Sequence, residues 1–238
     1  MDLIKILPEL HLLRFPVGQA YLWRDEDELT LIDAGAVGAG PQIAGAVTRL
    51  GLRPVDVRRI VLTHFHEDHA GGAGEFAALS GAQVLAHRLD ARIVRGEVPG
   101  PAPVLEEWEL PIWAEVAPQL PPAPAEPVVP DVLDLEDGDV LDFGGGARVV
   151  HAPGHTDGSI ALHLPRHGVL FTGDAVAASP VDGQVMLGVF NLDREQALAS
   201  FRELAALDTR VACFGHGDPV TEDGGAALRA SADGYAHL

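Results

Sequence analysis

The sequence predicts an α+β fold in which two sheets pack together and helices cover their outer faces. Two observations lead to this prediction. Both halves of the 238-residue chain contain a series of short strand-like segments followed by a helix, although no sequence repeat links the halves. The hydrophobic share of 47% is also large enough to form a buried core. We therefore expect a single domain over residues 1–238, made of two similar halves.

The first half opens with short apolar runs separated by turn residues. Pro8-Glu9 divides the first two runs and a charged turn at residues 24–27 divides the next two, which indicates antiparallel strands. Gly51 and Gly81 each follow a helix-like segment and mark its end. The predicted strands are residues 3–7, 11–15, 19–23, 28–33, 57–62 and 83–86, and the predicted helices are residues 41–50, 71–80 and 89–94.

Residues 96–130 differ from the rest of the chain. They hold ten of its 18 prolines and two of its three tryptophans, Trp108 and Trp113. So many prolines exclude a regular strand or a long helix. Long loops inside compact domains usually serve a function, so we expect a lid-like insertion here. Its tryptophans either contact the substrate or only pack the loop against the rest of the protein.

The second half returns to strands and ends with helices. Asp193 is a good helix N-cap, and Ala197, Phe201 and Leu204 lie on one face of the segment that follows it. The predicted strands are residues 131–135, 140–143, 147–151, 159–164, 168–172 and 211–214, and the predicted helices are residues 193–207 and 224–232.

Four potential metal ligands follow the strand at residues 57–62, namely His64, His66, Asp68 and His69. Residues two apart on an extended segment point the same way, so His64 and His66 form one pair. Adjacent residues of a strand diverge, so the chain must turn before it can present Asp68 and His69 as a second pair. Imidazole nitrogens and carboxylate oxygens suit a divalent metal, and two pairs indicate two metals.

Three further positions share one local pattern, in which a strand is followed by a glycine and then a histidine or aspartate. They are Gly154-His155, Gly173-Asp174 and Gly215-His216. Strand ends are rigid places from which to present ligands, and we expect the glycine to remove side-chain bulk beside the ion.

Together these motifs resemble the metallo-β-lactamase superfamily, in the branch that contains glyoxalase II and lactonases. The resemblance extends from Leu31-Ile32-Asp33-Ala34-Gly35 to Gly215-His216 and implies a four-layered αββα sandwich. It implies that one metal binds to His64, His66 and His155, and that the second binds to Asp68, His69 and His216. Asp174 would bridge the two. The histidines at positions 11, 87, 151, 163, 167 and 237 are expected to be surface or core groups.

By the same resemblance the protein is a metal-dependent hydrolase that uses a metal-bridging hydroxide, with Asp68 as the catalytic side chain. Asp174 argues against β-lactam cleavage, because β-lactamases of this family generally lack that aspartate. We expect a small-molecule ester, thioester or lactone as substrate, and two divalent ions. Zinc is the first choice, and Mn²⁺ or Fe²⁺ also suit the ligands.

Three alternatives stay open at this point. The first is a mononuclear iron persulfide dioxygenase of the same superfamily, and the second is a phosphodiesterase. The third is a metal-binding module without catalytic activity. Bound metal counts and activity on a substrate panel distinguish them.

The charge balance limits the partners. Acidic residues outnumber basic ones 35 to 16, so a net charge of −19 disfavours nucleic acid and anionic membranes. The N-terminus lacks the pattern of a signal peptide, so cytoplasmic placement is expected. Cys213, the single cysteine, is expected to be buried, and the oligomeric state is left open.

Overall fold

The computed structural model describes residues 1–119, 129 and 131–235. They form two compact units. Unit 1 comprises residues 1–100 and 120–135, and unit 2 comprises residues 101–119 and 136–238, each in its described part. The proline-rich stretch is therefore divided between the units, and its residues 120–128 and 130 lie outside the described part. That the two halves act as one domain stays a prediction.

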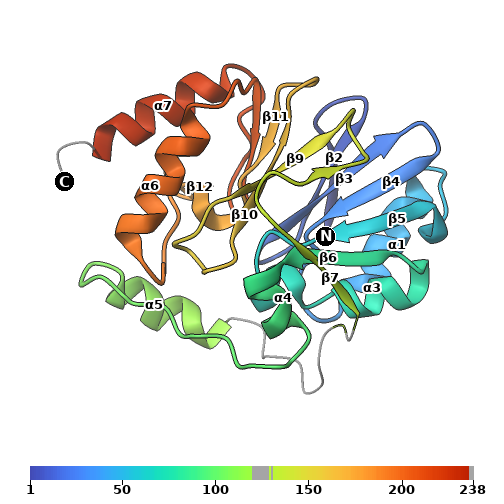
Figure 1. The fold of residues 1–238 in the computed structure, drawn as a ribbon, viewed down its shortest axis with the longest axis horizontal. Coiled ribbons are helices and arrows are strands. Elements are labelled where there is room, and N and C mark those ends of the chain that lie inside the picture. The colour runs from blue at the N-terminus through green and yellow to red at the C-terminus, as the bar shows by residue number, and fades with distance from the viewer. Residues whose placement is uncertain (120–128, 130, 236–238) are drawn as a thin grey trace. The chain divides into compact units, whose positions relative to one another are not determined.

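Unit 1 is built on a mixed sheet whose seven strands lie in chain order (Figure 1). The first four strands pair antiparallel, and the pairs from β4 to β7 are parallel. The strands are β1 (Asp2–Lys5), β2 (Leu10–Arg14), β3 (Gln19–Asp25), β4 (Glu28–Ile32), β5 (Val57–Val61), β6 (Gln83–His87) and β7 (Val132–Leu135).

Helices connect the parallel strands of unit 1. α3 packs against α1 and lies on β5 and β6, while α4 lies on β6 and β7. Buried side chains such as Leu31, Ile43, Ile60 and Phe76 join the sheet to these helices. The helices are α1 (Gly40–Arg49), η1 (Pro54–Asp56), α2 (Glu67–Ala70), α3 (Ala73–Ser80) and α4 (Arg88–Val94).

The helix predicted over residues 71–80 is shorter than expected, and α2 precedes it as a separate turn. The break lies at Gly71 and Gly72. A Cβ on Gly72 would lie 2.3 Å from the Ala34 carbonyl oxygen, and one on Gly71 would lie 2.7 Å from the Val37 amide nitrogen. The two glycines therefore let this break pass directly against the chain that follows β4.

Unit 2 contains a five-stranded mixed sheet of order β14-β11-β10-β9-β8 and a separate hairpin, β12–β13, that the sequence analysis did not predict. β8 to β11 pair antiparallel, and β11 pairs parallel with β14. The strands are β8 (Val140–Leu141), β9 (Ala147–His151), β10 (Ile160–Leu164), β11 (Val169–Phe171), β12 (Val176–Ala178), β13 (Val185–Leu187) and β14 (Val211–Cys213).

The two long helices of unit 2 lie side by side, and α7 also contacts β13 and β14 (Figure 1). Asp193 caps α6 as predicted, because its carboxylate accepts a hydrogen bond from the Gln196 amide at 2.9 Å. Cys213 is fully buried, as expected. The helices are α5 (Leu110–Val116), η2 (Ala117–Gln119), η3 (Gly173–Ala175), α6 (Arg194–Ala205) and α7 (Gly224–Gly234).

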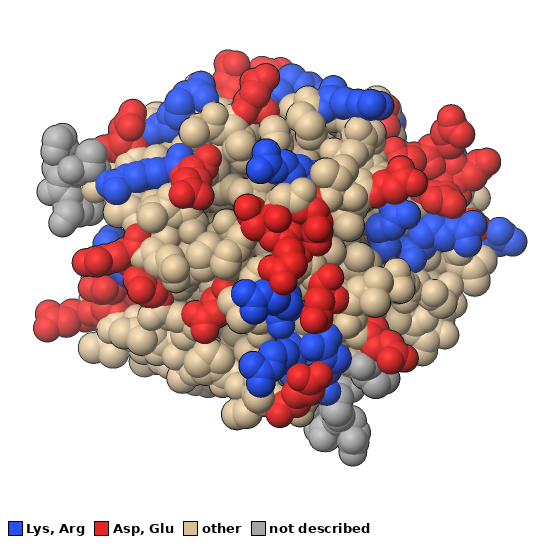
Figure 2. Space-filling view, in the orientation of Figure 1, with Lys and Arg blue, Asp and Glu red and all other residues tan. Residues whose placement is uncertain are grey.

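Among the described residues, no helix is both long and apolar enough to cross a bilayer. The face of the molecule drawn in Figure 2 carries Lys and Arg interspersed with Asp and Glu.

Candidate metal centre

In unit 1 the candidate ligands follow the parallel strands. Because β4, β5 and β6 run in the same direction, their carboxyl ends meet at one edge of the sheet. Asp33 follows β4, and the segment of His64 to His69 follows β5. His64, Asp68 and His69 are at most 8% exposed. This edge thus collects ionisable side chains in a place where solvent hydrates them poorly.

The carboxylate of Asp33 holds the histidine segment in place. It accepts hydrogen bonds from the Thr63 amide at 2.7 Å and from the Thr63 hydroxyl at 2.8 Å. Its Oδ2 also lies 3.0 Å from His69 Nδ1. Because a carboxylate only accepts, His69 Nδ1 carries the proton, and the lone pair is left on Nε2. His69 Nε2 lies 3.4 Å from Asp68 Oδ2, so this pair presents one nitrogen and one oxygen together.

The same reasoning sets the tautomer of His64. The Thr63 hydroxyl donates to Asp33, so at 3.0 Å from His64 Nδ1 it acts as the acceptor, and Nδ1 carries the proton. His64 Nε2 then directs its lone pair toward His66 Nδ1, 3.0 Å away. Two ring nitrogens this close need a proton or a metal ion between them. The two rings thus lie together as the spacing predicts, and their role as a ligand pair stays a prediction.

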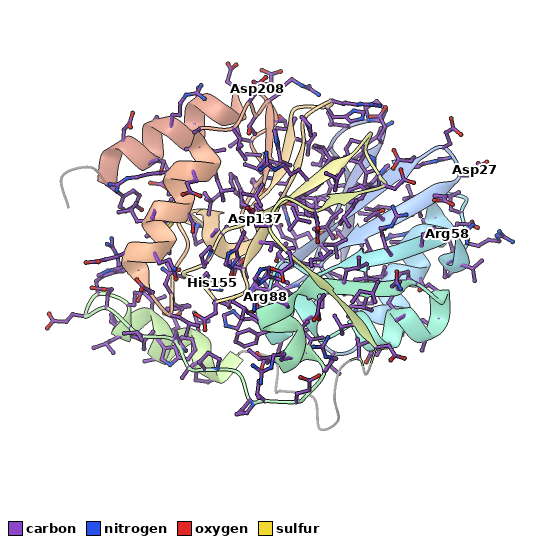
Figure 3. The ribbon with its side chains drawn as sticks, in the orientation of Figure 1. Asp27, Arg58, Arg88, Asp137, His155 and Asp208 are labelled. Carbon is purple, nitrogen blue, oxygen red and sulfur yellow. The ribbon has the colours of Figure 1, made fainter. Side chains whose placement is uncertain are left out.

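In unit 2 three strands deliver their following residues to one edge. β9 and β11 both pair antiparallel with β10, and β14 is parallel to β11, so β9, β11 and β14 share one direction. His155 follows β9 (Figure 3), Asp174 follows β11, and His216 follows β14. The structure therefore brings together the three strand-end motifs of the second half.

The Asp174 carboxylate lies between the two histidines. Its Oδ2 is 3.2 Å from His216 Nε2 and 3.6 Å from His155 Nε2. The side chains of His155 and Asp174 are 4% and 12% exposed, while that of His216 is 39% exposed. One carboxylate oxygen shared between two imidazoles has the arrangement that a bridging ligand needs.

The glycines near these ligands act differently from the prediction. A Cβ on Gly154 would lie 2.1 Å from the Ala197 amide nitrogen of α6, and a Cβ on Gly217 would lie 2.2 Å from the Ala178 carbonyl oxygen. Their φ angles of +125° and +85° also exclude most side chains. At Gly154, glycine thus makes room for neighbouring protein backbone, whereas the sequence predicts that it makes room for an ion. Gly217 also makes room for backbone, but it follows His216 and is not one of the predicted glycines.

Sequence reasoning missed two residues that orient the ligands. Asp33 was quoted only as part of a strand motif, although a non-glycine residue at a strand end with φ of +58° indicates a specialised position. Asp90 is 1% exposed and accepts a hydrogen bond from the Phe65 amide at 3.0 Å, between His64 and His66. No local sequence pattern connects Asp90 to Phe65.

The tryptophans occupy unlike positions. The Trp113 ring packs against Phe190 with ring centroids 4.9 Å apart, whereas Trp108 precedes α5 and is 48% exposed. Their role in substrate binding stays a prediction.

The other histidines described by the structure lie outside the seven candidate ligands. His151 Nε2 lies 2.8 Å from the Asp157 carbonyl oxygen, and His163 Nε2 lies 3.0 Å from that of Asp208. His237 is outside the described residues.

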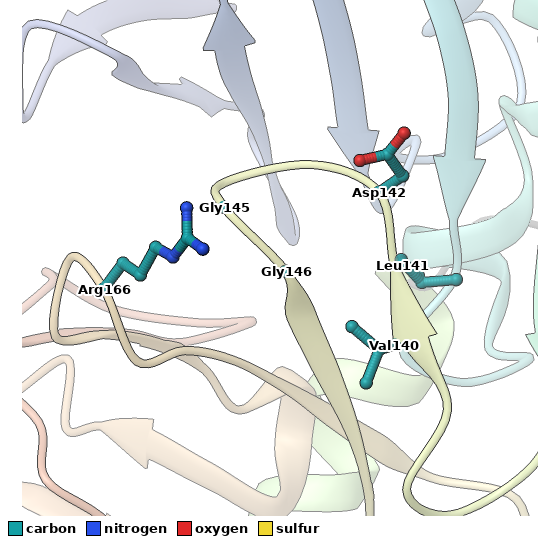
Figure 4. Close-up of a pocket in the computed structure, with 6 residues that line it drawn as sticks. All are labelled: Val140, Leu141, Asp142, Gly145, Gly146 and Arg166. Carbon is teal, nitrogen blue, oxygen red and sulfur yellow. The ribbon is translucent and has the colours of Figure 1, made fainter.

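A hollow of about 300 Å³ beside β8 is lined by the β8–β9 turn and by Arg166 (Figure 4), and none of the candidate ligands lines it.

The described residues thus contain groups of histidine and aspartate side chains that could hold metal ions. Ligand atoms lie within 4.8 Å of each other in the pairs His64–His66, His64–His69 and Asp68–His69. Buried imidazole nitrogens combined with carboxylates suit borderline divalent cations. The donor set therefore fits the metals that the sequence predicts.

Comparison with known proteins gives a consistent assignment. The profile of the metallo-β-lactamase superfamily matches residues 13–216. A hydroxyacylglutathione hydrolase from Gloeobacter violaceus is 32% identical over 195 residues, which is 81% of this chain and 61% of that protein. The uncharacterized protein YobT from Bacillus subtilis is 29% identical over 215 residues, or 85% of this chain and 84% of that protein. The chain spans less than two thirds of the length of the hydroxyacylglutathione hydrolases that it matches here.

Solved structures agree with this profile. A metallo-β-lactamase family protein from Thermus thermophilus is 29% identical, with a TM-score of 0.68 over 98% of this chain and 81% of that one. The metallo-β-lactamase SMB-1 is 22% identical, with a TM-score of 0.70 over 98% of this chain and 93% of that one, and shows the likeness of fold alone. The chain belongs to the metallo-β-lactamase superfamily and has its α+β fold of two mixed sheets flanked by helices.

Proposed function

We propose that this protein is a dinuclear metallo-hydrolase that cleaves a small-molecule ester, thioester or lactone. The observation that carries the proposal is the ligand arrangement within each unit. Unit 1 presents two pairs of donors at one sheet edge, and unit 2 presents a carboxylate oxygen between two imidazoles. Both sets lie within the part of the chain that the superfamily profile matches.

The proposed ligand sets combine donors from both units. His64, His66 and His155 would hold one metal, and Asp68, His69 and His216 would hold the other. Asp174 would be the ligand shared by the two, and the position of its Oδ2 between His155 and His216 supports this role. Zinc is the proposed ion, because borderline nitrogen and oxygen donors suit it.

Each neighbouring side chain has a defined task in this scheme. Asp33 fixes the ring of His69 and keeps its Nε2 available as a ligand atom. Asp68, 8% exposed, orients the attacking water through its carboxylate and holds the proton that the leaving group takes up. When bound, the two ions would supply an activated water and an electrophile for the substrate carbonyl.

Among the three substrate classes, a thioester has the most support. The curated relatives that align with most of this chain include several named hydroxyacylglutathione hydrolase, and that name describes a thioester substrate. Asp174 also disfavours β-lactam cleavage, and the net charge of −19 disfavours a nucleic-acid phosphodiester.

The test is hydrolysis of a panel of thioesters, esters, lactones and phosphodiesters by protein loaded with zinc, manganese or iron, together with elemental analysis. We expect two metals per chain and turnover of carbonyl substrates. The variants His66→Ala and Asp174→Ala should lose metal and activity, whereas His167→Ala, a histidine outside the ligand sets, should retain both.

Three results would count against the proposal. Wild-type turnover in His66→Ala or Asp174→Ala would refute the ligand assignment. One iron per chain together with oxygen uptake would replace the hydrolase with a persulfide dioxygenase. Full metal loading without turnover of any substrate in the panel would favour a metal-binding module that lacks catalytic activity.

A further inference from the structure

We propose that Phe190 and Trp113 form an aromatic wall that recognises a flat, apolar acyl group of the substrate, and that the buried carboxylate of Glu109 is the positioning group that holds this wall. The inference rests on the proposed hydrolase function and concerns its specificity. All three residues belong to unit 2.

The wall lies on a loop that is tied to the backbone of two proposed metal ligands. Gly188, at its start, packs so close to Asp174 that a Cβ would lie 1.7 Å from the Asp174 carbonyl oxygen. Near its end, the Leu192 amide donates to the His155 carbonyl at 3.3 Å. Phe190 is the middle residue between these two attachments, so its ring position depends on both ligand loops.

The backbone of Phe190 has an unusual conformation. Its φ is +59°, in the left-handed region that bulky residues rarely adopt. Strained backbone persists only where surrounding contacts impose it, and it is concentrated at binding and active sites. An aromatic residue kept at such a position, where glycine or asparagine would be relaxed, indicates that the ring itself is needed.

Glu109 holds the backbone of Phe190 in this conformation. Its carboxylate is buried, with the residue 2% exposed, and Oε1 accepts a hydrogen bond from the Phe190 amide at 2.9 Å. Oε2 accepts another from the Glu106 amide at 2.9 Å. The Val104 amide also donates to the Asn191 carbonyl at 3.0 Å. The segment before α5 is therefore joined to the Phe190 loop by a buried charge and a backbone hydrogen bond.

The two rings present an apolar surface. Trp113, on α5, meets Phe190 with ring centroids 4.9 Å apart and an interplanar angle of 71°, a stable edge-to-face arrangement. Both residues are partly exposed. An edge-to-face pair leaves ring faces on which a third flat apolar group can pack, so an arylacyl group is a better ligand than a short acyl group.

The experiment compares phenylacetyl and acetyl thioesters of N-acetylcysteamine as substrates of the metal-loaded protein. Phe190→Gly removes the ring and relaxes the backbone, Phe190→Tyr retains the ring, and Trp113→Leu removes the partner. Ile112→Ala is the matched control, since Ile112 neighbours Trp113 on α5 and is 41% exposed. Glu109→Gln weakens the anchor without changing its size.

We expect the ratio of kcat/KM for phenylacetyl over acetyl to fall roughly tenfold in Phe190→Gly and Trp113→Leu, mainly through KM. Glu109→Gln should lower it by a smaller factor in the same way. Phe190→Tyr and Ile112→Ala should keep the wild-type ratio.

A binding measurement separates this inference from the proposed function. The non-hydrolysable phenacyl thioether of N-acetylcysteamine should quench tryptophan fluorescence and bind at least about fivefold more weakly to Phe190→Gly than to wild type. If wild type hydrolyses neither thioester, the choice of a thioester substrate fails, and the thioether titration alone decides whether the aromatic wall binds an arylacyl group. An unchanged ratio and unchanged thioether affinity in Phe190→Gly would overturn the wall. Equal losses in Ile112→Ala would also overturn it.

Discussion

The two halves of the proposed metal centre are built in different ways. In unit 1 the ligands lie on one continuous segment, and hydrogen bonds that the side chains of Asp33, Thr63 and Asp90 accept hold them. In unit 2 they come from three strand ends, and close backbone packing at Gly154, Gly188 and Gly217 holds their loops. The first half therefore depends on polar side chains as well as on close backbone packing at Gly71 and Gly72, whereas the second depends mainly on its glycines.

This difference determines how substitutions in each half should affect metal affinity and stability. Loss of a hydrogen-bonding side chain leaves the backbone of unit 1 in place but misorients a ligand ring. A side chain added to one of the unit 2 glycines has no space and must displace the backbone. Substitution of the hydrogen-bonding side chains beside the unit 1 ligands should thus lower metal affinity before stability, while substitution of the glycines beside the unit 2 ligands should lower stability first.

The largest effect is expected for Gly154→Ala. Its Cβ would lie 2.1 Å from the Ala197 amide nitrogen at a φ of +125°, so the loop carrying His155 or the start of α6 must move. We expect a loss of free energy of unfolding on the order of 4 kcal/mol, measured by urea denaturation. Gly183→Ala, with φ of +72° but nothing within 4 Å, is the control and should cost about 1 kcal/mol. Similar losses for both would show that packing at Gly154 is unimportant.

The next effect tests unit 1. Asp33→Asn keeps the size of the side chain but removes the charge that faces His69 Nδ1. We expect metal affinity, measured by chelator competition, to fall by roughly 10–100-fold with a small change in unfolding midpoint. A large drop in stability with unchanged affinity would mean that unit 1 behaves as unit 2 does.

A smaller effect is expected at the cap of α6. Asp193→Ala leaves the Gln196 amide without its carboxylate acceptor and should destabilise the protein by about 1 kcal/mol in urea denaturation. Asp193→Asn retains an acceptor oxygen and should recover most of this loss. Because α6 packs against Gly154, the alanine variant would also weaken the backbone support of unit 2. If Asp193→Ala and Asp193→Asn were equally stable, the acceptor oxygen at position 193 would not stabilise α6 as a cap.

The smallest effect concerns His11 on β2. Burial, Lys5 and Arg24 all lower its pKa from the ordinary value of 6.5. The unfolded chain therefore binds a proton more readily than the folded chain, and His11 contributes a loss of stability as pH falls through 6.5 toward the lowered pKa. His11→Gln should reduce the slope of unfolding midpoint against pH in that window. An unchanged slope would contradict this.

Local patterns were enough to predict most of the fold. Turn residues and apolar runs located β1 to β7 and most strands of unit 2, and Gly51, Gly81 and Asp193 marked helix ends correctly. The hairpin β12–β13, whose short strands pair with each other and not with either larger sheet, was missed. The separate helix α2 was missed because the contacts that end it, at Gly71 and Gly72, come from the chain after β4.

The sequence by itself determined which side chains are candidate ligands, since side-chain type and short-range spacing are properties of neighbouring residues. Spacing alone paired His64 with His66, and strand-end glycines pointed to His155, Asp174 and His216. Tertiary structure decided what orients and surrounds these groups. Three hydrogen bonds, Asp33–His69, Asp90–Phe65 and Glu109–Phe190, join residues that are 36, 25 and 81 positions apart in the sequence. Such contacts follow from strand order and loop packing, and no local pattern encodes them.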